Sequence, residues 1–362
     1  MFMYMFVLCF LALAVDNTSA SCSFNLDTDL NGKSPLVILN NDILLPDNEQ
    51  GKVTLSNQAQ IQLLCSGSNN HLNVINSQNG YLETATCKND KFILPNGNSY
   101  KFQILKCQNP PMSYAQDVGQ CNAGARLIRF GFALSPSNFL EKITLCFDAQ
   151  RLATYWSRNI LRPSPYSCQV RDRVSFKTDF FKMIHTTINP EREYYHSGYD
   201  KGHLTPRCDF FTGPEKRMTF YYVNTSPQTP KLNSGNWKTL EGVIRTASNR
   251  AKRTLVIYTG TTETIRHLVQ IPIQKYFWKA VIDANSGEGI AFIGVNSVGT
   301  SVSSPCLIVN CQQVMWLGSL RLKFSDAGKG TIYCCAINNL RNIPNIQLPV
   351  LSEFRGGILW NM

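Results

Sequence analysis

The chain has 362 residues, of which 43% are hydrophobic and 16% are charged. This is an ordinary globular composition, which excludes a largely disordered chain, and the length is enough for one large domain or two smaller ones. A formal net charge of +11 favours a polyanionic partner, such as nucleic acid, a glycosaminoglycan or an anionic membrane.

The first fifteen residues, MFMYMFVLCFLALAV, form an apolar run that is too short to span a membrane. A polar stretch follows and places Thr18 and Ala20 at the −3 and −1 positions of a cut before Ser21. This pattern predicts a signal peptide over residues 1–20 and a secreted protein, although no Lys or Arg precedes the apolar run. A buried N-terminal helix is the alternative. No second long apolar run follows, so we expect no membrane association.

Twelve cysteines remain once Cys9 is removed with the signal peptide. They form no C-x-x-C pair and have no histidine partner at zinc-finger spacing, so we expect a disulfide framework rather than a metal site. The spacing does not fix the pairing. Cys334 and Cys335 are adjacent and are expected to bond to different partners.

Residues 21–107 are rich in Asn, Gln, Ser and Gly, and short apolar runs interrupt them. Such runs between Asn and Gly turns predict a small, β-rich domain. Its expected strands are residues 35–40, 60–65, 71–75, 91–94 and 100–107, and its expected internal disulfides involve Cys22, Cys65, Cys87 and Cys107. Residues 108–124, which include Pro110 and Pro111, are predicted to be a linker.

Residues 125–362 contain strand-like and helix-like runs and are predicted to form an α+β domain on an antiparallel sheet. The strand-like runs are residues 126–134, 142–149, 254–260, 276–284 and 289–296. The clearest helix is residues 233–252, because its apolar residues keep a helical period. They are Trp237, Leu240, Val243, Ile244 and Ala247.

The first segment with chemical content is Asp200-Lys201-Gly202-His203. Gly202 allows a tight turn and a close approach to another group. Histidine titrates near neutral pH and can accept a proton from water, and a neighbouring cation can stabilise charge that builds up on a phosphate. Alone, this tetrapeptide is a weak signal and is compatible with a purely structural role.

A second segment places Asn233, Trp237 and Glu241 on one stripe of the predicted helix. Asn233 offers a carbonyl oxygen and Glu241 a carboxylate, and Mg²⁺ prefers oxygen ligands while it keeps several waters. The alternative is a helix cap, a buried tryptophan and a solvated glutamate.

Together the segments resemble the DNA/RNA non-specific endonucleases of the His-Me finger (ββα-metal) class. The family pattern is D-R-G-H, then N-x-x-P-Q, then N-x-x-x-W-x-x-x-E. It corresponds here to Asp200–His203, Asn224–Gln228 and the Asn233 stripe, with intervals of 21, 9 and 8 residues between His203, Asn224, Asn233 and Glu241. The resemblance covers roughly residues 125–345 and is greatest to the secreted arthropod branch, which includes digestive double-stranded ribonucleases.

The resemblance implies a role for each matched position. His203 is the general base, Asn233 the direct ligand of Mg²⁺ (with Mn²⁺ as the alternative), and Glu241 the residue that orients metal-bound water. Asn224 steadies the site, and Asp200 orients the loop. The implied reaction is hydrolysis of DNA and RNA without sequence preference, which leaves 5′-phosphates.

One position departs from the family, because Lys201 stands where an arginine is usual. Lysine keeps the charge but not the planar, two-pronged grip on phosphate. A further phosphate-binding arginine is expected upstream, at Arg173 or Arg171. Arg207, Arg217 and Arg245 flank the motifs and are candidates for backbone contacts, with a solvated surface charge as the alternative for each.

The remaining histidines are expected to be structural or exposed. His196 is either at the rim of the cleft or simply on the surface, and no sequence partner was found for His71, His185 and His267. Asn224-Thr225-Ser226 is a formal glycosylation sequon, which we expect to be buried and unmodified.

Three functions compete. The first is an active endonuclease with no obligate protein partner. The second is a nucleic-acid-binding protein that lost its catalytic rate through Lys201. The third is a polyanion-binding or glycan-binding module centred on residues 21–107, which only the charge of the chain supports.

Overall fold

The computed structural model describes residues 21–75, 81–165, 168, 174–178, 188–296 and 304–362. The predicted signal peptide lies outside these residues. Within them, no helix combines the length and the apolar character needed to cross a membrane.

Residues 21–107 fold into two small antiparallel sheets. A six-stranded sheet has the order β3-β2-β5-β6-β7-β8, and a separate pair joins β1 to β4. The strands are β1 Cys22–Asn25, β2 Leu36–Leu39, β3 Asp42–Ile43, β4 Lys52–Leu55, β5 Gln60–Leu64, β6 Leu82–Lys88, β7 Lys91–Ile93 and β8 Ser99–Tyr100.

Two of the strand predictions for this region are wrong. Residues 71–75 contribute only a bridge between Leu72 and Cys107. In residues 100–107 the sheet ends at Tyr100, and Phe102–Ile104 form a 3-10 turn (η1). The turn directs Phe102 into a cluster of rings, stacked on Phe24 at 3.9 Å between centroids. Side-chain packing therefore overrides the β propensity of this run.

A nine-stranded sheet forms the centre of the molecule, and every pair of neighbouring strands is antiparallel, as predicted. Its order is β18-β19-β17-β16-β15-β12-β11-β10-β9. The strands are β9 Tyr114–Gln120, β10 Arg126–Ser135, β11 Asn138–Asp148, β12 Ala153–Leu161, β15 Leu255–His267, β16 Pro272–Asp283, β17 Gly289–Val295, β18 Ile308–Val309 and β19 Ile332–Cys335. Strand β9, at the edge of the sheet, falls within residues 108–124, so the segment expected to be a linker belongs in part to the sheet.

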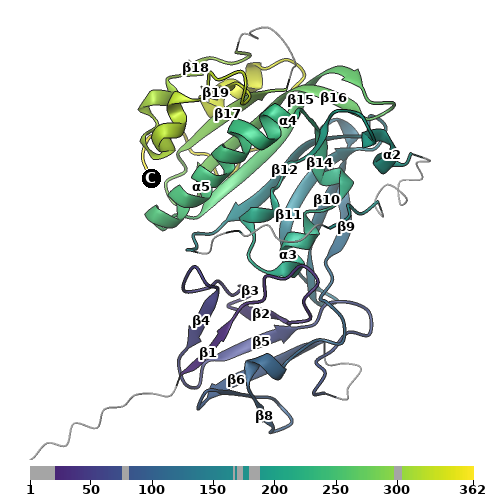
Figure 1. The fold of residues 1–362 in the computed structure, drawn as a ribbon, viewed down its shortest axis with the longest axis vertical. Helices are drawn as coiled ribbons and strands as arrows, with labels where there is room; N and C mark the ends of the chain where they lie inside the picture. Colours follow the sequence, from purple (N-terminus) through teal and green to yellow (C-terminus); the bar gives the residue numbers. More distant parts are fainter. Residues whose placement is uncertain (1–20, 76–80, 166–167, 169–173, 179–187, 297–303) are drawn as a thin grey trace, which may run out of the picture.

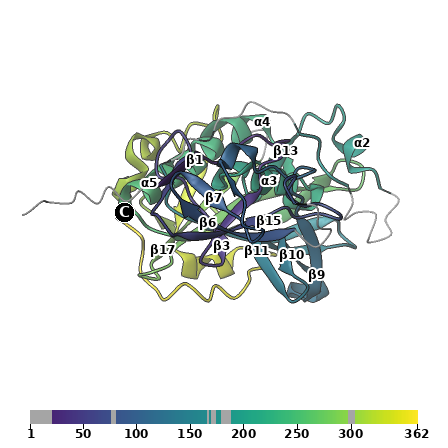
Figure 2. The same ribbon diagram turned by 90° about the horizontal axis from the view of Figure 1, so that it is seen from below.

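The α-helices lie on one face of this sheet, and the C-terminal segment crosses the other, as Figure 2 shows from below. The helices are α2 Pro190–Tyr194, α3 Gly213–Met218, α4 Pro230–Leu232, a π-helical turn η5 Asn233–Trp237, and α5 Lys238–Ala251. Short 3-10 turns complete the described chain: η2 Asn122–Gly124, η3 Arg207–Asp209, η4 Tyr222–Asn224, η6 Cys311–Gln313, η7 Met315–Leu322 and η8 Ile337–Asn342.

The predicted helix over 233–252 is therefore α5 preceded by a π-helical turn, in which the backbone at Gly235 is not helical. The predicted apolar face is correct at Trp237, Leu240 and Ile244, which are at most 1% exposed. That face packs on the sheet at Phe277 and Ile257.

Residues 21–107 have a hydrophobic core of their own, which includes Phe24, Val53 and Phe92, and a few of their residues also join a core cluster of the large sheet. Leu36, Ile38 and Ile43 pack in the same buried cluster as Phe130 and Ile143 of β10 and β11. Figure 1 shows this N-terminal part below the sheet, with α3 at the junction. The two parts are therefore joined by packing as well as by the chain.

All twelve cysteines pair, which confirms the expected disulfide framework. The N-terminal pairs are Cys22–Cys87 and Cys65–Cys107, both internal to residues 21–107. Cys334 and Cys335 bond to Cys311 and Cys306, which are different partners as predicted. The remaining pairs are Cys121–Cys146 and Cys168–Cys208.

Candidate active site

The motif residues meet on a two-stranded ladder that precedes α5. Strand β13 (Asp200–His203) pairs antiparallel with β14 (Thr225–Gln228), with His203 opposite Thr225. Lys201 and His203 are two residues apart and therefore point to the same face of this ladder. Two short strands followed by a helix thus bring together three segments that are separate in the sequence.

Gly202 lies within β13 and not in a tight turn, so that part of the expectation is wrong. The expected close approach is present, because a Cβ atom at Gly202 would lie 2.4 Å from Oε1 of Gln228. Both amide atoms of Gln228 are buried, and neither has a hydrogen-bond partner among the described residues. Any larger residue at position 202 would displace this side chain from the ladder.

Asn233 connects the helical segment to the start of β13. Its Nδ2 donates to Oδ2 of Asp200 at 2.9 Å. A carboxylate only accepts hydrogen bonds, so this contact fixes which end of the amide faces Asp200. The carbonyl oxygen Oδ1 of Asn233 is consequently the end that remains for a cation.

His203 lies between aromatic rings. Its imidazole packs against Phe176 at 5.2 Å and edge-on against Phe220 at 5.0 Å between centroids. Burial, with a smaller effect of the Arg207 charge, lowers the pKa of His203 to about 4. The ring is therefore neutral at pH 7 and has one nitrogen that can accept a proton. Its Nε2 is buried without a hydrogen-bond partner among the described residues, and such an atom is costly unless water or substrate meets it.

Lys201 lies in a cage of aromatic rings. Its Nζ is 5.2 Å from the centroid of Phe176, 5.1 Å from that of Tyr222 and 5.9 Å from that of Tyr194. Burial lowers the pKa of Lys201, and the Glu191 charge opposes this shift. No carboxylate of the described chain forms an ion pair with it. Cation–π contact thus holds the ammonium without neutralising it.

Asn224 is 1% exposed, and its side chain is occupied by the backbone. Oδ1 accepts from the Thr205 amide at 3.0 Å, and Nδ2 donates to the carbonyls of Thr205 and Thr219 at 2.9 Å. It therefore fixes the chain just after His203 and is a positioning residue. The same bonds occupy the nitrogen of the sequon, as expected for an unmodified site.

Glu241 belongs to a buried group of charges. Burial raises its pKa to about 7, while the charges of Lys279 and Arg245 oppose this shift and that of Asp209 adds to it. Arg245 Nη1 is 3.1 Å from Oδ1 of Asp209, so Arg245 is paired and is not simply a solvated charge. The expected orienting carboxylate thus has two cations near it.

Lys279 was not predicted. It lies on β16, is 1% exposed, donates to Oγ1 of Thr259 at 2.5 Å, and lies 5.4 Å from the Trp237 ring. Its only signal in the sequence is a single charge in the middle of the apolar run YFWKAVI, since a buried strand carries a charge only where it is paired or functional.

The donor set fits a hard cation that keeps most of its waters. Within the described residues, no group of three or more His, Cys, Asp or Glu side chains could hold a metal ion. Asn233 Oδ1 and the carboxylate of Glu241 are oxygen donors, which are the kind of ligand that a hard cation such as Mg²⁺ prefers.

Other candidate residues are only partly brought to the site. Arg173 and Arg171 lie outside the described residues, as does His185. Arg207 lies over the Phe220 ring at 5.9 Å, close to His203. Arg217 binds backbone carbonyls of Leu30 and Pro111 and is not a solvated charge. His196 is exposed and packs against Tyr195 at 4.0 Å.

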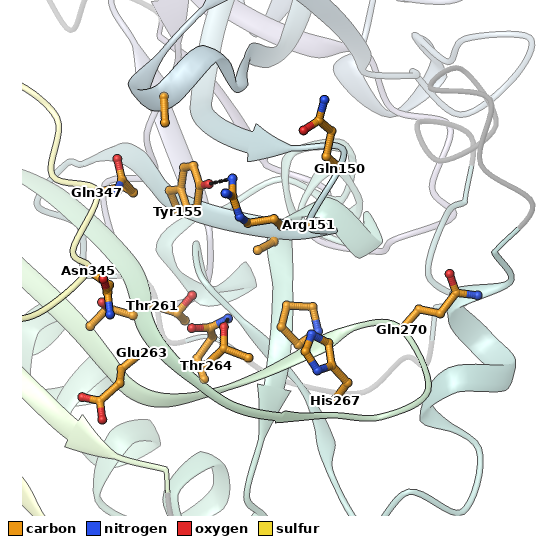
Figure 3. Close-up of a pocket in the computed structure, with 15 residues that line it drawn as sticks. Gln150, Arg151, Tyr155, Thr261, Glu263, Thr264, His267, Gln270, Asn345 and Gln347 are labelled. Carbon is orange, nitrogen blue, oxygen red and sulfur yellow. Dashed lines mark hydrogen bonds between the residues drawn. The ribbon is translucent and has the colours of Figure 1, made fainter.

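A cavity of about 630 Å³ lies elsewhere on the molecule. Figure 3 shows its lining side chains, which come from β12, β15 and the C-terminal segment and include Tyr155, Glu263, His267 and Asn345. None of the motif residues is among the described residues that line it.

Comparison with known proteins identifies the class. The family model of the DNA/RNA non-specific endonucleases matches residues 123–348, and the chain belongs to this family. By class it is a hydrolase of the endonuclease type. The nine-stranded sheet, the β13–β14 ladder and α5 all lie within the matched residues or overlap them.

Individual relatives come from insects and from mitochondria. A salivary endonuclease of Lutzomyia longipalpis is 26% identical over 63% of this chain and 63% of its own length. A salivary endonuclease of Culex quinquefasciatus is 23% identical over 96% of this chain and 95% of its own. Human mitochondrial endonuclease G is 30% identical over 33% of this chain and 40% of its own.

Proposed function

We propose that this protein is a secreted, Mg²⁺-dependent endonuclease that hydrolyses the phosphodiester bonds of DNA and RNA without sequence preference and leaves 5′-phosphates. We further propose that its site is a His-Me finger (ββα-metal) formed by β13, β14 and α5. The observation that carries the proposal is the contact between Asn233 and Asp200 at 2.9 Å on the same ladder as His203.

Each residue of the site has a separate role in the proposed reaction. His203, neutral at pH 7 because its pKa is about 4, accepts a proton from the attacking water. Lys201 places a positive charge beside the phosphate, and Asn224 holds the backbone that follows His203. Arg207 and Arg173 are proposed to contact the backbone of the nucleic acid.

The proposed metal would be held by Asn233 Oδ1, with Glu241 orienting a water of its shell. When bound, Mg²⁺ supplies positive charge for the scissile phosphate and for the leaving oxygen. Glu241 must be ionised for this role; burial raises its pKa to about 7, and the charges of Lys279 and Arg245 oppose that shift and favour the ionised form.

Secretion is supported by the six disulfides, which persist in oxidising compartments, and by salivary relatives. The absence of an obligate protein partner remains an expectation. The resemblance to the digestive arthropod branch makes double-stranded RNA one candidate substrate beside double-stranded DNA and single strands.

A nicking assay on supercoiled plasmid tests the proposal. Wild type should nick in Mg²⁺ and stop in EDTA, and Asn233→Ala should shift the Mg²⁺ titration to higher concentration as well as lower the rate. If the Mg²⁺ titration of Asn233→Ala overlays that of wild type, Asn233 is not a metal ligand and has only a structural role at the start of the helix. A protein that binds DNA but never nicks it would be the silent nucleic-acid-binding protein.

A further inference from the structure

Helix α3 (Gly213–Met218) lies in the connection between the two strands of the site, and it leads directly to two aromatic residues of the site. Phe220 packs edge-on against His203 at 5.0 Å, and the Tyr222 ring is 5.1 Å from Lys201 Nζ. A shift of α3 would therefore move the rings that hold both residues. Figure 1 shows α3 next to the N-terminal part of the chain, and three separate contacts tie the two together.

The first contact is a backbone approach at Gly213. Its amide donates to the carbonyl of Asp27 at 3.2 Å. A Cβ atom at Gly213 would lie 1.7 Å from the carbonyl oxygen of Asp29, which is backbone and cannot rotate away. The start of α3 thus sits directly on the loop of residues 27–30.

The second contact is Arg217. Its guanidinium donates to two backbone carbonyls, those of Leu30 and Pro111. One side chain of α3 therefore bonds to both ends of the N-terminal part, the loop that follows β1 and the segment that leads to β9. Guanidinium is suited to this role because its donors form a rigid fork.

The third contact is an ion bridge through Lys142 of β11. Its Nζ lies 2.7 Å from Oδ1 of Asp42 in β3 and 3.7 Å from Oε1 of Glu215 in α3. Glu215 is 1% exposed and also closes a capping box with Thr212 at the start of α3. The side chains of Lys142 and Glu215 are largely buried while that of Asp42 is partly exposed, and removing one of the two buried charges would leave the other without this partner.

From these contacts we propose that residues 21–111 act as a built-in brace that fixes the geometry of the active site. Arg217 is the positioning residue: it holds α3 in place, and α3 in turn positions Phe220 against His203 and Tyr222 against Lys201. The brace rests on the proposed nuclease function, because it acts on the general base. It assigns a role to a part of the chain in which the sequence shows no catalytic constellation.

The test compares two arginines that bind the same N-terminal part. Arg217→Ala breaks the tie to α3. Arg162→Ala is the matched control, because Arg162 donates to the Ile43 carbonyl at 2.7 Å and pairs with Asp42 at 3.0 Å from outside α3. Both variants lose one guanidinium clamp, and thermal melts of the full-length proteins measure how much stability each has lost.

Arg217→Ala is expected to lower kcat on a defined DNA duplex by about ten- to a hundredfold, the scale for small misplacement of a reacting group, with KM changed less than about threefold. Arg217→Lys should recover part of kcat, because one donor group can still reach a carbonyl. Arg162→Ala should keep kcat within about twofold. An unchanged kcat in Arg217→Ala, or an equal fall in Arg162→Ala, overturns the brace.

A second readout does not depend on turnover. The chain has 5 histidines, so ring signals of histidine-labelled protein are few, and the His203 signal senses the Phe220 ring. That signal should move in Arg217→Ala and stay in place in Arg162→Ala. If wild type never cuts nucleic acid, the proposed function fails, while an unmoved His203 signal in Arg217→Ala overturns the brace itself. Should Arg217→Ala not fold, Lys142→Met replaces it, with the same shift expected and the same outcome against it.

Discussion

The two parts of the molecule differ most in charge. Residues 21–107 contain six Lys and no Arg against seven Asp and Glu, a net charge of −1, whereas residues 125–362 contain 29 Lys and Arg against 15 Asp and Glu, a net charge of +14. The basic character that indicates a polyanionic partner therefore belongs to the part that carries the β13–β14 ladder. A polyanion-binding role for the N-terminal part loses the charge on which it relied.

The difference shows how one fold separates two tasks. On the proposed function, the C-terminal part supplies the cations and the reacting groups, while the N-terminal part, with a net charge of only −1, supplies backbone carbonyls that hold α3. Backbone carbonyls bind an arginine without adding negative charge, so a brace made of them does not repel a phosphate chain. The division predicts that variants in the two parts have effects of very different size.

The largest effect is expected at His203. His203→Ala should lower the rate by at least ~10²–10⁴-fold, the range for loss of a general base, while the Tm and the circular dichroism spectrum stay close to those of wild type. Plasmid cleavage at saturating Mg²⁺ measures it. A folded His203→Ala protein that keeps more than about a tenth of the wild-type rate removes His203 from the base role.

The next effect is expected at Lys201. Lys201→Met keeps length but removes the charge and should cost roughly 10²–10³-fold, mostly in kcat, as for one preorganised electrostatic group. Lys201→Arg should retain activity, because a guanidinium also stacks on the rings of Phe176 and Tyr222. Steady-state kinetics of the three proteins decide it. A wild-type kcat in Lys201→Met would mean that the charge of Lys201 has no part in catalysis and that its contacts with the rings are only structural.

The sequence predicts those features that follow from a local pattern. Short, largely apolar runs predicted β10, β11, β16 and β17, because a strand buried on both faces leaves a nearly continuous apolar signal. Two segments that the motifs singled out pair as β13 and β14, and Asn233, the first residue of the third motif, contacts Asp200. The features that were missed depend on contacts between distant segments.

Three residues illustrate this. The cage around Lys201 needs Phe176 from another segment, and the charge near Glu241 comes from Lys279 on β16. From the sequence, Arg217 is a candidate contact to the nucleic-acid backbone or a solvated charge, but its partners Leu30 and Pro111 lie more than a hundred residues away along the chain. Spacing within one segment contains no information about such partners.

A smaller and more specific effect concerns protonation of the base. Burial and the Arg207 charge both disfavour the imidazolium form, which lowers the pKa of His203 to about 4. Its ring signals in NMR should therefore remain those of neutral imidazole from pH 7 down to about pH 5. An unfolded histidine binds its proton near pH 6.5, so this group favours folding above that pH, and its contribution is lost as the pH falls towards 4. A His203 signal that titrates near pH 6.5 would show that the ring is not held as described.

The smallest effect is expected from cations of the N-terminal part. Lys88 and Lys101 are exposed there, and replacing both with Gln in the inactive His203→Ala background should change DNA affinity less than about twofold. The salt dependence of binding should also stay the same, since each phosphate contact contributes a fixed amount to that slope. Arg207→Gln in the same background is the matched change near the site, and it should weaken binding and reduce the slope by about one contact. Fluorescence anisotropy at three or more salt concentrations measures both quantities. If the two N-terminal substitutions weakened binding as much as Arg207→Gln does, nucleic acid would extend over the N-terminal part, and the division between a neutral brace and a basic catalytic surface would be wrong.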